Sequence, residues 1–102
     1  MRILSGPIFF EWDKGNIGKN LTKHGVLDKE TEEVFVNSPK FILEDIKHSS
    51  TEKRYMVWGR TNGGKFLTEI FTIRQNKIRI ISARYMSRKE RKRYEEKIKN
   101  YS

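Results

Sequence analysis

The 102-residue chain contains no cysteine, so it can form neither a disulfide bond nor a cysteine-ligated zinc or iron–sulfur site. This composition is typical of proteins that work in a reducing compartment, and we expect a cytoplasmic location. No stretch approaches the roughly 20 consecutive apolar residues of a membrane-spanning helix. The opening segment, residues 1–7, has too few apolar residues for a signal peptide. The sequence therefore predicts a soluble protein with no membrane partner.

Acidic residues are also few, because 13 Asp and Glu stand against 22 Lys and Arg and leave a formal net charge of +9. Such a charge on a small domain favours an anionic partner, and nucleic acid, an acidic membrane surface and an acidic protein all fit. Aromatic residues make up 12% of the chain, which is too many for a disordered segment. The length predicts one compact domain over residues 1–102.

The first forty residues favour one strand and two helices. Residues 8–12 form an apolar run of strand character that ends at Asp13, a good N-cap for a helix over residues 14–24. Asp28 predicts the N-cap of a second helix. Pro39 predicts the end of that helix, because the residue before a proline disfavours helical geometry.

The rest of the chain is rich in β-forming residues. Candidate strands cover residues 41–46, 54–60, 66–74 and 78–85. The pair Asn62-Gly63 favours a tight type I′ hairpin turn, and short turns make consecutive strands antiparallel. Ser87 and Glu90 have the spacing of a capping box and predict a terminal helix. The apolar stripe of that helix comprises Tyr94, Ile98 and Tyr101. The expected fold is α+β, with the helices packed on one antiparallel sheet.

Arginines on the predicted strands are the strongest candidates for a functional site. A guanidinium can hold two phosphate oxygens at once and stays charged throughout the physiological pH range. The candidates are Arg54, Arg60, Arg74, Arg79 and Arg84. By parity Arg54 and Arg60 share one face of their strand, whereas the sequence does not fix the register of the others. A strand arginine is as often a solvated charge that protects a sheet edge.

Other candidate side chains have more than one interpretation. His24 could transfer protons, because imidazole titrates near neutrality, or it could be a plain helix C-cap before a glycine. Lys23 could contact phosphate, Trp58 could stack on a base, and Trp12 is expected in the core. His48 is expected on the surface. The basic residues of the terminal helix either form a solvated face or bind an anion.

Two further motifs are better explained by structure than by chemistry. Residues 59–65 fit the spacing G-x-x-x-x-G-K of a nucleotide-binding loop, but Phe66 replaces the Ser or Thr that would reach magnesium. Glu44 and Asp45 could form an acid/base pair or bind a metal, but neighbouring strand residues point to opposite faces and no histidine cluster is nearby. We expect a hairpin at the first motif, a structural role for the second, and neither a metal site nor a cofactor.

Several segments, in this order, resemble the BrnT family. They are Phe10-Glu11-Trp12-Asp13, Lys19-Asn20-Leu21, Lys23-His24-Gly25-Val26, Glu33-Val34-Phe35 with Pro39, the strand residues Arg54, Gly59, Thr72 and Arg74, and finally residues 79–84 with Glu90, Arg91 and Tyr94. Each match is short, but together they cover nearly the whole chain. The resemblance implies a RelE-like fold and a ribonuclease toxin of a type II toxin–antitoxin system.

Members of this family cut RNA without a metal and inhibit translation, and a BrnA-type antitoxin with a ribbon-helix-helix domain neutralises them in a hetero-oligomer. The resemblance, added to the needs of phosphodiester cleavage, assigns two sets of residues. The catalytic set is Arg54, Arg74, Arg84 and His24, and the RNA-binding set is Lys23, Arg60, Arg79 and Trp58. The alternative is a basic module that binds nucleic acid or an acidic protein without cutting it.

Overall fold

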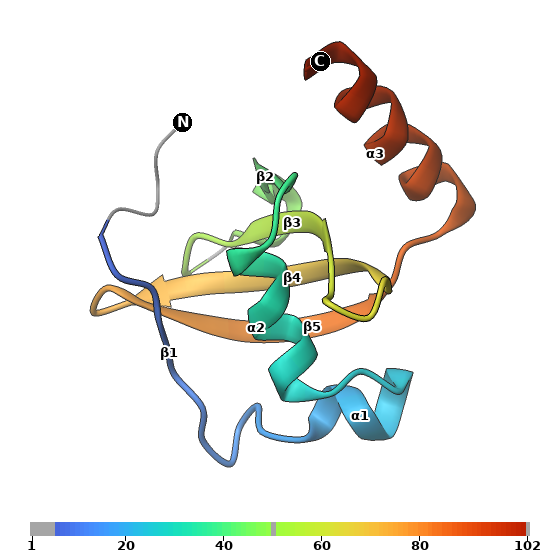
Figure 1. Ribbon diagram of the computed structural model, residues 1–102. Coiled ribbons are helices and arrows are strands. Elements are labelled where there is room, and N and C mark those ends of the chain that lie inside the picture. The colour runs from blue at the N-terminus through green and yellow to red at the C-terminus, as the bar shows by residue number, and fades with distance from the viewer. Residues whose placement is uncertain (1–5, 50, 102) are drawn as a thin grey trace.

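The computed structural model describes residues 6–49 and 51–101, apart from the side chains of His48 and Tyr101. Its elements in chain order are β1 (Phe9–Phe10), α1 (Lys19–His24), α2 (Asp28–Val36), β2 (Phe41–Glu44), the 3₁₀ turn η1 (Ile46–His48), β3 (Tyr55–Arg60), β4 (Phe66–Arg74), β5 (Lys77–Tyr85) and α3 (Arg88–Tyr101). Figure 1 shows α2 lying across the central strands and α3 standing away from them. The predicted α+β class is confirmed.

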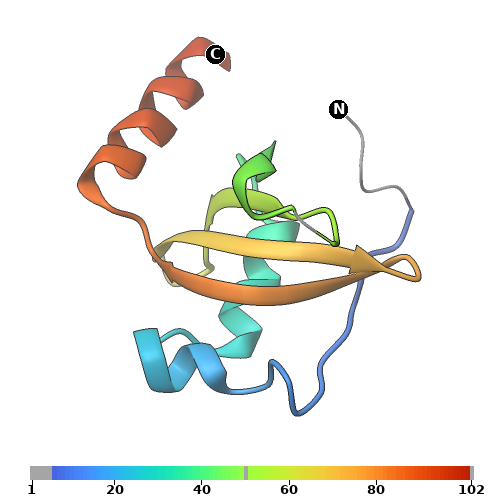
Figure 2. The same ribbon diagram turned by 180° about the vertical axis from the view of Figure 1, so that it is seen from behind.

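The strands form one five-stranded sheet in the order β1-β5-β4-β3-β2. All pairs are antiparallel except β1 and β5, which run parallel. The core lies between α2 and the sheet face that it covers, where Phe35 packs edge to face on Phe71 with 5.0 Å between ring centroids. The view from behind in Figure 2 shows the opposite sheet face without a helix across its middle. We call this second surface the open face.

One irregularity in β5 decides which residues reach the open face. Phe71 pairs with Ile80 and Ile70 pairs with Ser82, so Ile81 is an extra residue opposite the β4 backbone. Such a β-bulge shifts the alternation of side chains by one position along the strand. Ile80 and Ala83 therefore both lie in the core although they are separated by an odd number of positions.

The two N-terminal helices do not begin where the sequence predicts, because α1 begins later and α2 begins one residue earlier. Residues 14–18 form a turn, and Gly18 takes a left-handed φ of 70° before α1 starts, so the predicted helix over 14–24 is wrong in its first half. Asp28 is not the N-cap of α2. That position belongs to Leu27, whose backbone N–H donates to the Glu30 carboxylate over 2.9 Å, while the Asp28 carboxylate accepts the Gly18 N–H at the same distance.

The turns between β3, β4 and β5 also differ from the prediction. Asn62-Gly63 does not form a two-residue type I′ turn, because the positive φ falls on Gly64 in a longer loop closed between Thr61 and Lys65. The left-handed pair is instead Gln75 and Asn76, between β4 and β5. The first strand, predicted over residues 8–12, covers only Phe9–Phe10, and the second, predicted over 41–46, ends at Glu44.

The capping box that begins α3 is confirmed. Ser87 donates its N–H to the Glu90 carboxylate over 2.8 Å, and the Glu90 N–H donates to the Ser87 hydroxyl over 3.1 Å. Tyr94 then anchors the helix, because its buried ring meets Phe41 and Phe66 edge to face and its hydroxyl donates to the Pro39 carbonyl over 2.7 Å. None of the described helices is long and apolar enough to cross a membrane.

Candidate functional site

All five strand arginines face the open side of the sheet. Arg54 and Arg60 lie an even number of positions from Trp58 and therefore share its side of the sheet. Paired residues of neighbouring strands also lie on the same side. Trp58 pairs with Thr68, Thr68 pairs with Arg84, and Thr72 pairs with Arg79. Without the bulge at Ile81, Arg79 and Arg84 would point to opposite faces, because five positions separate them. The fold thus places on one surface the arginines that the sequence predicts as functional candidates.

Within this surface one groove of about 470 Å³ brings Arg54 and Arg84 together. Its floor is apolar and comes from four strands. The lining residues are Leu43, Glu44, Asp45, Arg54, Met56, Ile70, Ile81, Ser82 and Arg84. We call it the arginine groove. Two cations beside an apolar floor suit a ligand that carries phosphate next to a flat, weakly polar ring.

Arg54 enters the groove from the connection that leads into β3. Its backbone is fixed on both sides, since its N–H donates to the Ser49 hydroxyl over 2.9 Å and its carbonyl accepts the Asp45 N–H over 2.8 Å. Within the described chain its guanidinium makes no ion pair or hydrogen bond, although its charge helps lower the pKa of the Glu52 carboxyl. Arg54 is therefore a cation with a fixed backbone and an uncommitted head group.

Arg84 is held by α3. Its two terminal nitrogens donate to the two Glu90 oxygens over 2.7 and 3.0 Å, a bidentate pair that fixes the guanidinium plane. Partial burial acts to raise the pKa of the Glu90 carboxyl, but the hydrogen bonds from Arg84 and Ser87 outweigh it and bring that pKa to about 2. Glu90 is thus an ionised partner that positions Arg84 at neutral pH.

Arg74 and Arg79 lie at the far end of the open face and are engaged by acids. Arg74 donates to Glu52 over 2.6 and 3.1 Å, and this hydrogen bonding raises the pKa of the arginine. Arg79 donates to Glu11 and Asp13 over 2.9 to 3.0 Å, and its hydrogen bond to Asp13 is the main reason that the pKa of that carboxyl is lowered. Neither arginine lines the arginine groove.

Arg60 and Trp58 lie toward the other end of β3. Arg60 is six residues from Arg54, so roughly 20 Å of strand separates them, and its guanidinium reaches the Ser38 carbonyl over 3.4 Å. Trp58 is only 4% exposed, so it presents no ring face on which a base could stack. Trp12 packs against the core, as expected, and donates its indole N–H to Glu32 over 2.7 Å.

Lys23 and His24 are exposed in the last turn of α1, where basic side chains complement the helix dipole. That helix lies along β5, to which Asn20 binds through the Ala83 N–H over 3.0 Å, and neither Lys23 nor His24 lines the arginine groove. The proton-transfer role of His24 stays a prediction, and its position agrees with the C-cap interpretation. The side chain of His48 lies outside the described residues.

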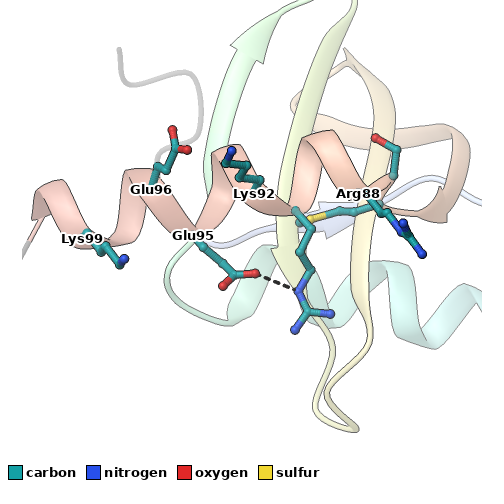
Figure 3. Close-up of a pocket in the computed structure, with 8 residues that line it drawn as sticks. Arg88, Lys92, Glu95, Glu96 and Lys99 are labelled. Atoms are coloured by element: carbon teal, nitrogen blue, oxygen red, sulfur yellow. Dashed lines mark ion pairs between the residues drawn. The ribbon is translucent and has the colours of Figure 1, made fainter.

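The basic helix α3 carries a second depression of about 440 Å³. Figure 3 shows Glu95 and Glu96 lying along the helix between Arg88 and Lys92 on one side and Lys99 on the other. An ion pair of 3.3 Å joins Arg91 to Glu95. Charges of both signs on one exposed helix face fit a solvated surface better than a phosphate site.

Sequence reasoning missed the apolar floor of the arginine groove and the role of Glu90. A signal existed for the floor, because Met56 and Ile70 alternate with the core residues Val57 and Phe71, so both faces of these strands are apolar. The Glu90 carboxylate was predicted only as a cap, yet the same group holds Arg84. No group of three or more potential metal ligands occurs among the residues that the structure describes.

Comparison with known proteins adds the family. A family model described as the ribonuclease toxin, BrnT, of type II toxin–antitoxin systems matches residues 12–90, a range that runs from before α1 through β5 to the start of α3. No curated protein matches the chain. The matched segment contains Arg54, Arg84 and Glu90 and covers most of the chain. The protein therefore belongs to the BrnT family of ribonuclease toxins, whose members act on RNA and are paired with an antitoxin.

Proposed function

We propose that this chain is a single toxin domain, residues 1–102, that cleaves RNA in the arginine groove without a metal ion and thereby inhibits translation. A BrnA-type antitoxin with a ribbon-helix-helix domain would neutralise it, and the fold would be of the RelE type. The observation that carries the proposal is the meeting of Arg54, just before β3, and Arg84, on β5, in one groove of a family member.

The chemistry follows from where the charges lie. Attack of a ribose 2′-hydroxyl on the adjacent phosphate forms a 2′,3′-cyclic phosphate and expels the 5′-oxygen, and negative charge accumulates on the phosphoryl oxygens in between. Arg54, whose guanidinium makes no ion pair within the described chain, binds the phosphate although Glu44 and Asp45 line the same groove. Together with Arg84 it stabilises the growing charge. Among the histidines whose side chains the structure describes, none lines the groove, and in this proposal one water accepts the proton of the 2′-hydroxyl and another protonates the leaving oxygen.

The apolar floor gives the proposal a substrate preference. Single-stranded RNA can turn an unpaired base onto Met56, Ile70 and Ile81 while its phosphate lies between the arginines. A duplex presents no such base, because its bases are stacked and its deep major groove is closed to side chains. We therefore expect cleavage in single-stranded segments.

Incubation of the purified protein with a 5′-labelled single-stranded RNA in excess EDTA tests the proposal. We expect fragments that end in 2′,3′-cyclic phosphate. Arg54→Ala should lower the rate by about 10²- to 10³-fold, as removal of one transition-state charge partner commonly does. Arg93→Ala, an equal loss of charge on the exposed face of α3, is the matched control and should stay within about twofold of the parent in the same assay.

The competing function is binding of RNA without cleavage. Both functions predict affinity that falls steeply with salt, so binding alone does not separate them. The parent protein could bind the RNA and arrest growth in cells while the RNA stays intact. That result would replace the nuclease proposal with the binding module. Arg84→Ala gives a second test, because it should relieve growth arrest while the protein still binds its antitoxin.

A further inference from the structure

We propose that the outer edge of β2 is the docking site for an extended, acidic segment of the antitoxin, which adds to the sheet as a sixth strand. This inference rests on the proposed toxin function and goes beyond it by naming the contact surface. It starts from the position of β2, the last strand in the sheet order.

The backbone groups available at this edge follow from the pairing with β3. Asp45 and Arg54 are opposite each other and share the hydrogen bond from Asp45 N–H to the Arg54 carbonyl, 2.8 Å long. Because bonded and non-bonded pairs alternate in an antiparallel ladder, Ile42 and Glu44 are non-bonded toward β3. Their N–H and C=O groups point outward, and within the described chain no backbone group pairs with them. They form the template that strand addition requires.

The opposite edge of the sheet is closed by the protein itself. There β1 pairs with β5, the Glu11 N–H donates to the Ile78 carbonyl over 2.8 Å, and the side-chain amides of Asn16 and Asn20 bind the Ile80 carbonyl and the Ala83 N–H. The fold thus covers one edge with specific hydrogen bonds. Of the two described edge strands, β2 offers the longer open ladder, with four residues against the two of β1.

The surroundings of the β2 edge indicate the charge of the occupant. A groove of about 590 Å³ runs beside the strand, and Lys40 and Lys97 line it together with apolar and neutral residues. No acidic side chain is among its described lining residues. Lys97 lies 5.6 Å from the centre of the Phe41 ring, and Leu43 is 38% exposed. A segment that alternates carboxylates with apolar side chains would satisfy both features.

A second copy of the chain fits this edge less well than an acidic partner. Pairing of two β2 strands would bring Lys40 and Lys97 of both copies into one seam, and each copy carries a net charge of +9. Lysines at an exposed edge are a common means of discouraging self-association. The same lysines attract a strand of opposite charge, so they select the partner as well as exclude the copy.

The position of the β2 edge also suggests how neutralisation occurs. Leu43 lines both the groove beside β2 and the arginine groove. A strand added at the β2 edge would therefore border the entrance to Arg54 and Arg84, where its carboxylates would repel RNA phosphate. Docking and inhibition would then be one event.

The first test removes one outward hydrogen-bond donor. Glu44→Pro deletes the outward N–H without touching a bond to β3, and a proline is tolerated at such a position of an edge strand. Glu44→Ala is the matched control, because it removes the same exposed side chain and keeps the N–H. Titration with the antitoxin encoded beside the toxin gene, purified alone, should show at least a tenfold loss of affinity for Glu44→Pro and less than a twofold change for Glu44→Ala.

The second test reverses the charge of the groove. Lys40→Glu combined with Lys97→Glu should also weaken the antitoxin at least tenfold, whereas Lys77→Glu, at the far end of the sheet, should have little effect. Circular dichroism and melting temperatures confirm that each variant is folded. Unchanged affinity in either the proline or the charge-reversal variant would overturn the proposal. Cleavage of RNA by the same preparations without antitoxin is measured in parallel, so failure of the nuclease function is seen separately from failure of docking.

Discussion

A carboxyl group buried in the core should make the stability of this toxin fall as the pH rises. Glu69 lies on β4 between Val57 and Ala83 of the flanking strands, on the core side of the sheet and not in the arginine groove. It is 0% exposed, and neither carboxyl oxygen has a hydrogen-bond partner among the described residues. Burial raises the pKa of Glu69 well above its usual 4.5.

The direction and size of the effect follow from proton linkage. The folded protein retains the Glu69 proton at pH values where the unfolded chain has already released it. The free energy of unfolding that the Glu69 proton contributes is therefore fully present below pH 4.5. It is lost as the pH rises toward the folded-state pKa, by about 1.4 kcal/mol for each pH unit. For a domain of this size that corresponds to roughly 6–11 °C in melting temperature per unit.

Glu69→Gln is the informative perturbation, because glutamine has nearly the same shape and cannot ionise. Urea and thermal unfolding, followed by circular dichroism from pH 4 to pH 8, should show the variant gaining on the parent protein as the pH rises above 4.5, until the folded-state pKa of Glu69 is passed. Glu96→Gln makes the same chemical change on an exposed turn of α3 and should give a difference that does not vary with pH in this way. Parallel stability curves for the parent and Glu69→Gln would refute the reasoning.

Three further predictions concern the parts that hold the site together. Glu90→Gln should lower the free energy of unfolding at pH 7 by only about 1–2 kcal/mol, since solvent screens the pair of Glu90 with Arg84. The difference should vanish as the pH falls from 4.5 toward 2, where the Glu90 carboxylate of the parent also loses its charge. Denaturant unfolding at several pH values measures this difference. Gly59→Ala should cost about 1–3 kcal/mol, because its Cβ would lie 2.7 Å from a Val34 methyl carbon of α2, and a stability above that of the parent would contradict this packing. His24→Gln should keep RNA cleavage within about threefold of the parent rate, whereas a loss of 10²-fold or more would restore the histidine as general base or acid.

Local sequence patterns predicted most of the fold. The α+β class, the three-strand meander and the capping box at Ser87 all depend on neighbouring residues, and the structure has them. Predictions failed where an element depends on distant partners. Asp28 has the side chain of an N-cap, but the Gly18 N–H on another segment takes its carboxylate. Asn62-Gly63 has the composition of a tight turn, but the loop lengthens to close on Lys65.

The candidate site could be predicted only in part, for a related reason. The residue type was clear from the sequence, since arginines recur on the β-segments. Their grouping was not, because it depends on strand register and on acids far away in the chain. Arg79 and Arg74 match the family pattern as well as Arg84 does, yet Glu11, Asp13 and Glu52 engage them outside the arginine groove.

The extra residue at Ile81 has a consequence for how this strand tolerates change in length. Deletion of Ile81 alone would leave Ile78, Ile80 and Ala83 on the core face, because the remaining residues of β5 would then alternate regularly opposite β4. The strand can therefore lose this one residue without exchanging its core and open faces. A second inserted residue next to Ile81 would instead have to be accommodated by a larger distortion of the ladder.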